Sequence, residues 1–118
     1  MSSAPRTARG RRTRERILES ALKEFGKVGY HDASIVRITE GAGVAMGTFY
    51  LYFEGKLEVF NELVEDLNRR MRHRMTQAIA EAPDRLAAER AGFRAFFEFT
   101  TEYPQLYRII RQAEFVSP

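Results

Sequence analysis

The sequence predicts an all-α protein, and three observations support this. Apolar residues recur at steps of three and four along most of the 118-residue chain, as on one face of successive helices. No segment alternates apolar and polar residues as a half-buried strand does, and no repeat is present. The content of 44% hydrophobic and 30% charged residues is that of a folded globular chain.

The first helix is predicted to begin at Thr13, whose hydroxyl can cap it, and to end near Gly29. Gly29 is a candidate for the left-handed backbone conformation that follows many helices. Tyr30 is then expected to fold back onto the helix as a hydrophobic anchor. The apolar face of this helix comprises Ile17, Leu18, Ala21, Leu22, Phe25 and Val28.

Two short helices are predicted next, over residues 34–41 and 45–52. Ser34 is a good N-cap for the first of them, because its hydroxyl can accept a hydrogen bond from the first turn. Gly41 and Gly43 are expected to end that helix, and Gly43 is the better candidate for a turn that needs positive φ. The residues of the second short helix that are expected to face the core are Phe49 and Phe53.

Three further helices complete the predicted fold. A long one runs from Lys56 to about Ala80, with a core stripe that starts at Leu57 and Phe60. The next helix begins after the segment EAPDR. Pro104 is expected at the first position of the last helix, where proline is tolerated because no N–H is needed. The aromatic side predicted for the fifth helix comprises Phe93, Phe96 and Phe97.

The two short helices and the glycine turn between them have the spacing of a helix-turn-helix motif, over about residues 34–53. The second helix of such a motif enters the major groove of DNA. Gly47 lets the backbone approach DNA, and Thr48 offers a hydroxyl and a methyl group to base edges. Tyrosine hydroxyls and the free N–H groups at helix starts can bind phosphates. The candidate DNA-binding residues in and beside the motif are Ser34, Ala45, Met46, Gly47, Thr48, Tyr50, Tyr52 and Lys56.

Positive charge is concentrated at the start of the chain. Residues 1–14 contain five arginines and no acidic residue, whereas the remainder has 14 basic and 16 acidic residues. We expect residues 1–10 to form a flexible basic arm, and Arg11 and Arg12 to contact DNA beside it. The alternative is that these arginines only keep the chain in solution.

Residues 13–57 resemble the DNA-binding domain of the tetracycline-repressor (TetR) family of bacterial transcriptional regulators. The resemblance rests on the opening helix TRERILESALKEFGKVGY, on the Ser34 cap, and above all on the run AGVAMGTFYLYFEGKLEVF. It implies a three-helix, homeodomain-like DNA-binding domain over residues 11–60. The same resemblance implies that Met46, Gly47 and Thr48 contact the bases of DNA. It implies phosphate contacts for Ser34, Tyr50, Tyr52 and Lys56.

Two positions depart from the family pattern. Ala45 replaces a usual serine, which removes a helix cap and a possible phosphate contact. Thr39 replaces a small alanine at a close contact between helices. These changes bear on individual contacts and leave the predicted class of protein unchanged.

The resemblance also implies a second part of the molecule. After a long linking helix, residues 61–118 are expected to be an incomplete helical domain for effector binding and dimerisation, because family members continue through several more helices. We therefore expect a fragment whose full-length form is a homodimer that binds a small-molecule effector. The candidate ligand-binding residues are Phe96, Phe99 and Tyr103.

The function predicted is that of a sequence-specific transcriptional regulator, a ligand-responsive repressor that binds a palindromic operator in double-stranded DNA at the nucleoid in the bacterial cytoplasm. An enzyme is not expected, because the chain has no cysteine, only two histidines, and no recognisable set of catalytic, metal-binding or cofactor-binding residues. No apolar run is long enough to span a membrane. The alternative, from another class, is a helical protein-interaction module, such as an adaptor or antitoxin, with an incidental basic arm.

Overall fold

The computed structural model describes residues 7–116, and within them it contains helices and no strand. The predicted all-α class is therefore confirmed. Residues 1–6, which make up most of the expected arm, lie outside the described part of the chain. Residues 117–118 also lie outside it. The six helices are α1 (Ala8–Asp32), α2 (Ile35–Ala42), α3 (Met46–Tyr52), α4 (Lys56–Ala80), α5 (Arg85–Glu102) and α6 (Leu106–Val116).

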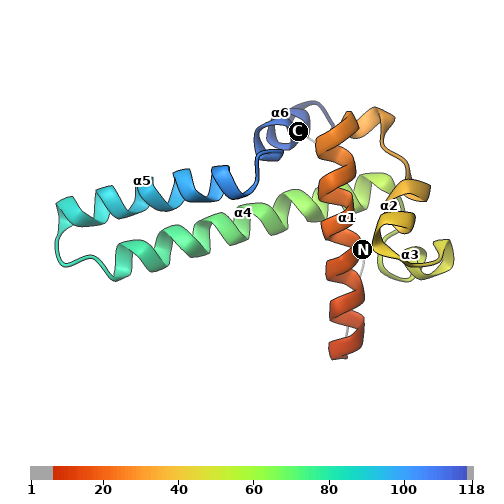
Figure 1. The fold of residues 1–118 in the computed structure, drawn as a ribbon, viewed down its shortest axis with the longest axis horizontal. Helices are drawn as coiled ribbons and strands as arrows, with labels where there is room; N and C mark the ends of the chain where they lie inside the picture. Colours follow the sequence, from red (N-terminus) through yellow and green to blue (C-terminus); the bar gives the residue numbers. More distant parts are fainter. Residues whose placement is uncertain (1–6, 117–118) are drawn as a thin grey trace.

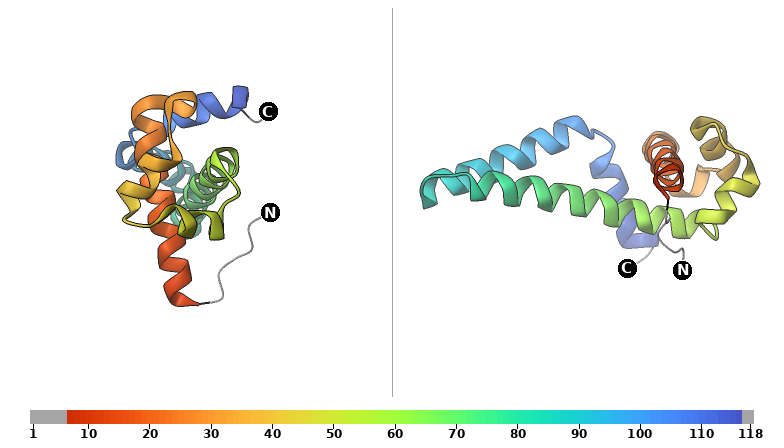
Figure 2. Two further views of the ribbon diagram at one scale, coloured as in Figure 1. Left: turned by 90° about the vertical axis from the view of Figure 1, so that its right-hand side faces the viewer. Right: turned by 90° about the horizontal axis from the view of Figure 1, so that it is seen from below.

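The helices form an elongated molecule with a compact end and a projecting hairpin (Figure 1). Helices α1, α2 and α3 gather around the beginning of α4 at the compact end. Helix α4 then leads away from them, and α5 returns along it in the antiparallel direction (Figure 2). Helix α6 packs against the later part of α1, so the chain comes back to its first helix.

Helix α1 begins earlier than predicted. Thr7 is its N-cap, with Oγ1 accepting a hydrogen bond from the N–H of Gly10 at 3.0 Å. Thr13 lies inside the helix, where its hydroxyl donates to the carbonyl of Arg9 at 3.0 Å. The stretch between the two threonines contains three arginines, which are good helix formers, and no proline, so the helix runs through it despite Gly10. Residues 8–10, expected in the flexible arm, are thus part of α1.

Gly29 breaks the regular course of α1. Its φ of 83° is positive, but its ψ of 172° lies outside the left-handed helical region, so the predicted left-handed conformation is wrong. The kink leads into a last short stretch of the helix, in which the ring of Tyr30 stacks on Phe25 at 5.9 Å and meets Phe60 edge-on at 5.0 Å. The predicted return of Tyr30 onto the helix is confirmed.

One hydrophobic core joins the compact end to the hairpin. Five phenylalanine rings are fully buried: Phe25, Phe49, Phe53 and Phe60 lie on or beside α1, α3 and α4, and Phe99 lies on α5. The predicted core stripe of α4 is wrong at its first position, because Leu57 is exposed while Val59 is buried. The remaining buried residues of α4 follow at helical spacing and are Phe60, Leu63 and Leu67.

The aromatic side predicted for α5 is not its packing side. Helix α5 rests on α4 through Gly92, Ala95 and Phe99, whose spacing of three and four puts small residues where the helices approach. Phe93 and Phe97 consequently face away from this contact and are exposed. Pro104 also lies two residues before α6, which begins at Leu106, and not at its first position as predicted.

Candidate nucleic-acid interface

Helix α2 and the turn after it are closed by local hydrogen bonds. The Oγ of Ser34 accepts from the N–H of Arg37 at 3.1 Å, which confirms the predicted N-cap. Gly43 has φ 69° and ψ 36°, the left-handed conformation predicted for it. The N–H groups of Gly43 and Val44 donate to the carbonyls of Glu40 and Thr39 at 3.2 and 3.0 Å. This pattern is a Schellman motif, and it sets the direction in which α3 leaves.

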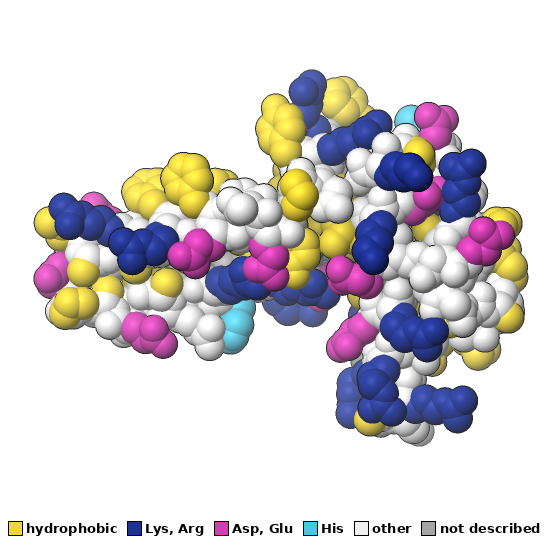
Figure 3. Space-filling view, in the orientation of Figure 1, with side chains coloured by type: hydrophobic (Ala, Val, Ile, Leu, Met, Phe, Trp, Pro, Cys, Tyr) yellow, Lys and Arg dark blue, Asp and Glu magenta, His cyan; other side chains and the backbone are white. Residues whose placement is uncertain are grey.

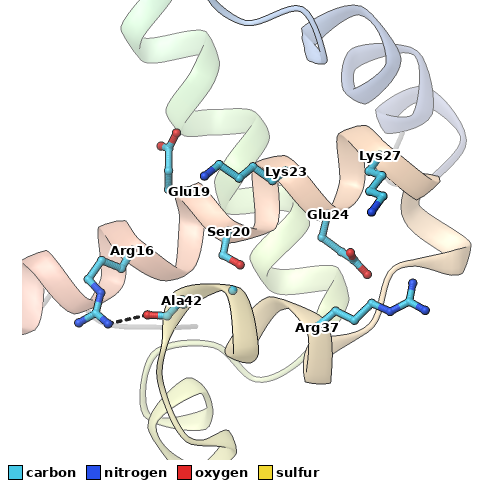
Figure 4. A pocket seen from close by; sticks show the side chains of 9 residues that line it. Arg16, Glu19, Ser20, Lys23, Glu24, Lys27, Arg37 and Ala42 are labelled. Carbon is cyan, nitrogen blue, oxygen red and sulfur yellow. Dashed lines mark hydrogen bonds between the residues drawn. The ribbon is translucent and has the colours of Figure 1, made fainter.

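Helix α1 holds this turn and α2 in place with two polar side chains. Arg16 donates through Nη2 to the carbonyl of Ala42 at 2.6 Å (Figure 4). The hydroxyl of Ser20 donates to the carbonyl of Ile38 at 2.7 Å. Arg16 thus holds the turn and Ser20 holds α2, so the position of α3 depends on α1.

Gly41 has a different role from the one predicted. It does not end α2, which continues to Ala42. A Cβ atom on Gly41 would lie 2.4 Å from the Oγ of Ser20, well inside van der Waals contact. The glycine is therefore needed because α1 and α2 pack closely at this point.

Helix α3 is anchored on one side and open on the other. Phe49 and Phe53 are fully buried, as predicted. Gly47 has open space around the position of a Cβ atom, and Leu51, one turn later, is largely exposed. No side chain caps α3 at Ala45, in agreement with the loss of the usual serine.

The predicted DNA-binding residues of α3 do not all have the same surroundings. Met46, Gly47 and Tyr50 lie on exposed parts of the helix, and Thr48 is half-buried. Tyr52 is packed against the hydrophobic core as a partly buried residue. Leu51 was missed as a candidate, although a helical wheel that places Phe49 and Phe53 inside puts Gly47 and Leu51 directly outside.

Lys56, which was predicted to form an anion site at the start of α4, has partners within the protein. Its Nζ donates to the carbonyls of His31 and Ala33, each at 3.2 Å, and lies 4.6 Å from the centroid of the Tyr30 ring. These carbonyls lie at the junction of α1 and α2, where helical partners run out, so they attract the ammonium. Lys56 thus ties that junction to α4.

The first turns of α1 carry a cluster of exposed cations. Arg9, Arg11 and Arg12 are exposed there, and Figure 3 shows basic side chains gathered at this end of the molecule. Arg14 differs, because it pairs with Glu62 at 3.1 Å and lies over the ring of Phe53. The basic surface at the start of α1 is therefore formed by the three preceding arginines.

A groove of about 410 Å³ runs between α1 and α2 (Figure 4). Its walls carry charges of both signs, with Lys27 and Arg37 close to the carboxylate of Glu24. Glu24 also accepts from the N–H of Ser34 at 3.1 Å, which supports the start of α2. Arg37 thus lies on the side of α2 that faces α1.

The three candidate ligand-binding residues do not share one environment. Phe99 is fully buried in the core, with its ring 4.7 Å from that of Tyr103. The phenol oxygen of Tyr103 accepts from Arg70 at 3.0 Å, and Arg70 is paired with Asp66 at 2.7 Å. Desolvation by burial lowers the pKa of Arg70, but Coulombic attraction from Asp66 and the bond to Tyr103 together raise this pKa above its ordinary value. Phe96 is exposed.

Residues 17–63, which hold α2, α3 and the Arg16-bound turn, match the family model described as "Bacterial regulatory proteins, tetR family". The chain belongs to this family. The TetR-type match places the family's signature on the three N-terminal helices and the beginning of α4.

Individual relatives and structures agree with this TetR assignment. The chain is 38% identical over 72 residues to the HTH-type transcriptional regulator YdgC of Bacillus subtilis, a match covering 61% of this chain and 36% of YdgC. It is 30% identical over 104 residues to the HTH-type transcriptional activator FasR of Mycolicibacterium smegmatis, covering 88% of this chain and 48% of FasR. A TetR family regulator from Marinobacter aquaeolei VT8 has the same fold, with a TM-score of 0.83, 21% identity, and coverage of 89% and 55%. The chain thus spans about half the length of these proteins or less.

Two further properties apply to residues 7–116. None of their helices is long and apolar enough to cross a membrane. No group of three or more histidine, aspartate or glutamate side chains among them is placed to hold a metal ion.

Proposed function

We propose that this chain is the DNA-binding part of a transcriptional regulator and that α3 enters the major groove. The observation that carries the proposal is the fixed position of α3, whose buried rings and turn are held by α1 while its Gly47 side is open. A rigid helix with one free side, preceded by a capped helix and a tight turn, is what groove recognition requires. The TetR family match supports the same function.

The residues of the interface divide into two roles in this proposal. Met46, Gly47 and Thr48, at the start of α3, face the base edges. The hydroxyls of Tyr50 and Tyr52 and the first turn of α2 at Ser34 face phosphates on the groove walls. At the beginning of α1, Arg9, Arg11 and Arg12 contact the DNA backbone. Lys56 acts indirectly, because it holds the α1–α2 junction.

The second part of the molecule is proposed to receive an effector and to hold two copies together. Exposed aromatic residues on α5 and α6, such as Phe93 and Phe115, offer apolar surface to further helices. A small molecule bound in that region would change the spacing of two DNA-binding domains and so their fit to a palindromic operator. Repression is the predicted outcome, although the relative FasR is named an activator.

Selection of duplexes from a random DNA pool tests the function directly. We expect the chain to enrich a short common motif, bound more tightly at low salt than at high salt. A protein-interaction module would enrich no motif and would show no salt-dependent shift of duplex DNA. A reporter gene placed behind the enriched motif then distinguishes repression from activation by the sign of the response.

A further inference from the structure

The recognition helix lacks the side chains that usually read bases through paired hydrogen bonds. Guanine is commonly read by arginine or lysine, and adenine by asparagine or glutamine. Helix α3 has the sequence MGTFYLY and contains none of these residues. Arg37, the cation of α2, lines the groove toward α1. Specific readout by α3 is therefore left to hydroxyl groups, such as that of Thr48, and to apolar contacts.

The most exposed side chain of α3 is apolar. Leu51 is 80% exposed and lies on the side of the helix opposite the buried Phe49 and Phe53. Gly47 precedes it by one turn and leaves open space on the same side. Leu51 therefore projects from the free side of α3, away from the core.

The apolar surface continues onto α2. Met46 is 38% exposed, and its Sδ lies 3.5 Å from the hydroxyl of Thr39. Val36 is 51% exposed and precedes Thr39 by three residues, which puts both on the same side of α2. Figure 3 shows hydrophobic side chains along the edge of the molecule where Figure 1 places these two helices. We call Val36, Met46 and Leu51 the apolar reading surface.

We propose that the apolar reading surface recognises the 5-methyl groups of thymine, with Leu51 as the principal contact. The thymine methyl is the apolar group that base edges present in the major groove, and side-chain carbon atoms recognise it by direct contact. The preferred DNA sites would then carry thymines at fixed positions under α3. This inference rests on the proposed function, because it assumes that α3 enters the major groove.

The test replaces thymine by deoxyuridine in the duplex enriched by selection, one position at a time. Deoxyuridine lacks only the methyl group and keeps every hydrogen-bonding atom of the base. Affinity is measured by fluorescence anisotropy at low salt with the chain of 118 residues. We expect about fourfold weaker binding at each contacted position, from the transfer free energy of one buried carbon group.

The variant Leu51→Ala assigns the contact to a residue. It should bind the thymine duplex more weakly than the unchanged chain does, and it should lose little further affinity when the contacted thymine becomes deoxyuridine. Leu57→Ala is the matched control, since Leu57 is 46% exposed on α4 and is expected to leave the effect of the methyl unchanged. Circular dichroism checks that both variants are folded. If either is not, the deoxyuridine series measured on the unchanged chain still tests the methyl contact.

Two outcomes separate the inference from the function on which it rests. If a motif is enriched but lacks thymine, or tolerates deoxyuridine at every position, the methyl readout is wrong and sequence-specific binding stands. The same conclusion follows if Leu51→Ala loses equal affinity on both duplexes. If no motif is enriched, the proposed function itself fails.

Discussion

The backbone N–H of Tyr30 donates to Oε1 of Gln112 at 3.0 Å, which joins the end of α1 to α6 across 82 positions of sequence. Arg108 of α6 donates to the carbonyls of Gly26 and Lys27, at 3.3 and 3.1 Å, in the same region of α1. Since the earlier part of α1 holds the turn before α3, α1 contacts both α6 and that turn. This is a physical connection between the two parts of the molecule.

Gln112→Ala should lower the stability of the fold. The substitution leaves the half-buried N–H of Tyr30 without its side-chain partner, which typically costs about 1–3 kcal/mol. Thermal unfolding followed by circular dichroism measures the change. Arg111→Ala is the control, because Arg111 is exposed and lies over the exposed ring of Tyr107. Equal melting temperatures for the two variants would show that the bond to α6 does not stabilise α1.

Gly41→Ala should destabilise the protein, although alanine is the better helix former by about 1 kcal/mol. The added Cβ would meet the Oγ of Ser20 at 2.4 Å, and relief of this contact requires Ser20 to give up its bond to Ile38. Gly47→Ala is the matched control in open space, where helix propensity acts alone and stability should not fall. A gain in the free energy of unfolding for Gly41→Ala would contradict the close packing of α1 on α2.

Lys56→Ala and Tyr50→Phe should separate a structural role from a phosphate contact. Lys56→Ala removes two bonds to carbonyls and a contact with Tyr30, so it should cost about 1–3 kcal/mol of stability. Tyr50→Phe should leave stability unchanged and weaken binding to matched and mismatched duplexes alike, because a phosphate contact carries no sequence information. Urea unfolding and paired DNA titrations check both. If the Lys56→Ala variant were as stable as the unchanged chain and yet bound DNA weakly, Lys56 would instead be a direct phosphate contact.

The basic turns of α1 should determine part of the salt dependence. Replacing Arg9, Arg11 and Arg12 together by alanine keeps the helix that Thr7 caps, whereas deletion of this segment would remove it. If two of the arginines contact phosphates, the slope of log K against log salt should fall in magnitude by about 2. An unchanged slope would mean that these arginines serve only solubility.

The chain of 118 residues should self-associate through its exposed aromatic residues. Phe93, Phe97 and Phe115 are exposed on α5 and α6, and large exposed apolar surfaces attract partners. Sedimentation velocity should show a mass that rises with concentration, and Phe97→Ser should shift the equilibrium toward the monomer. A stable dimer that binds a two-fold symmetric site tightly would instead show that residues 57–118 are sufficient for dimerisation.

Much of the interface follows from the sequence alone, because its determinants are local. The Ser34 cap depends on atoms three residues apart, and the turn at Gly43 depends on one positive φ. The spacing of Phe49 and Phe53 fixes which side of α3 faces inward, since a helix rotates by a constant angle at each residue. These local features specify the helix-turn-helix motif, and with it the resemblance to the TetR family, independently of how the helices pack.

Tertiary structure decided the features that depend on a neighbour distant in sequence. Lys56 is drawn to carbonyls of the α1–α2 junction, and Gly41 is required by Ser20 of another helix. On α5, small residues at Gly92 and Ala95 allowed close packing on α4 and left the neighbouring aromatic rings outside. Periodicity shows that a helix has an apolar stripe, but the contacting side is the one whose shape fits its partner, and that fit exists only after the chain has folded.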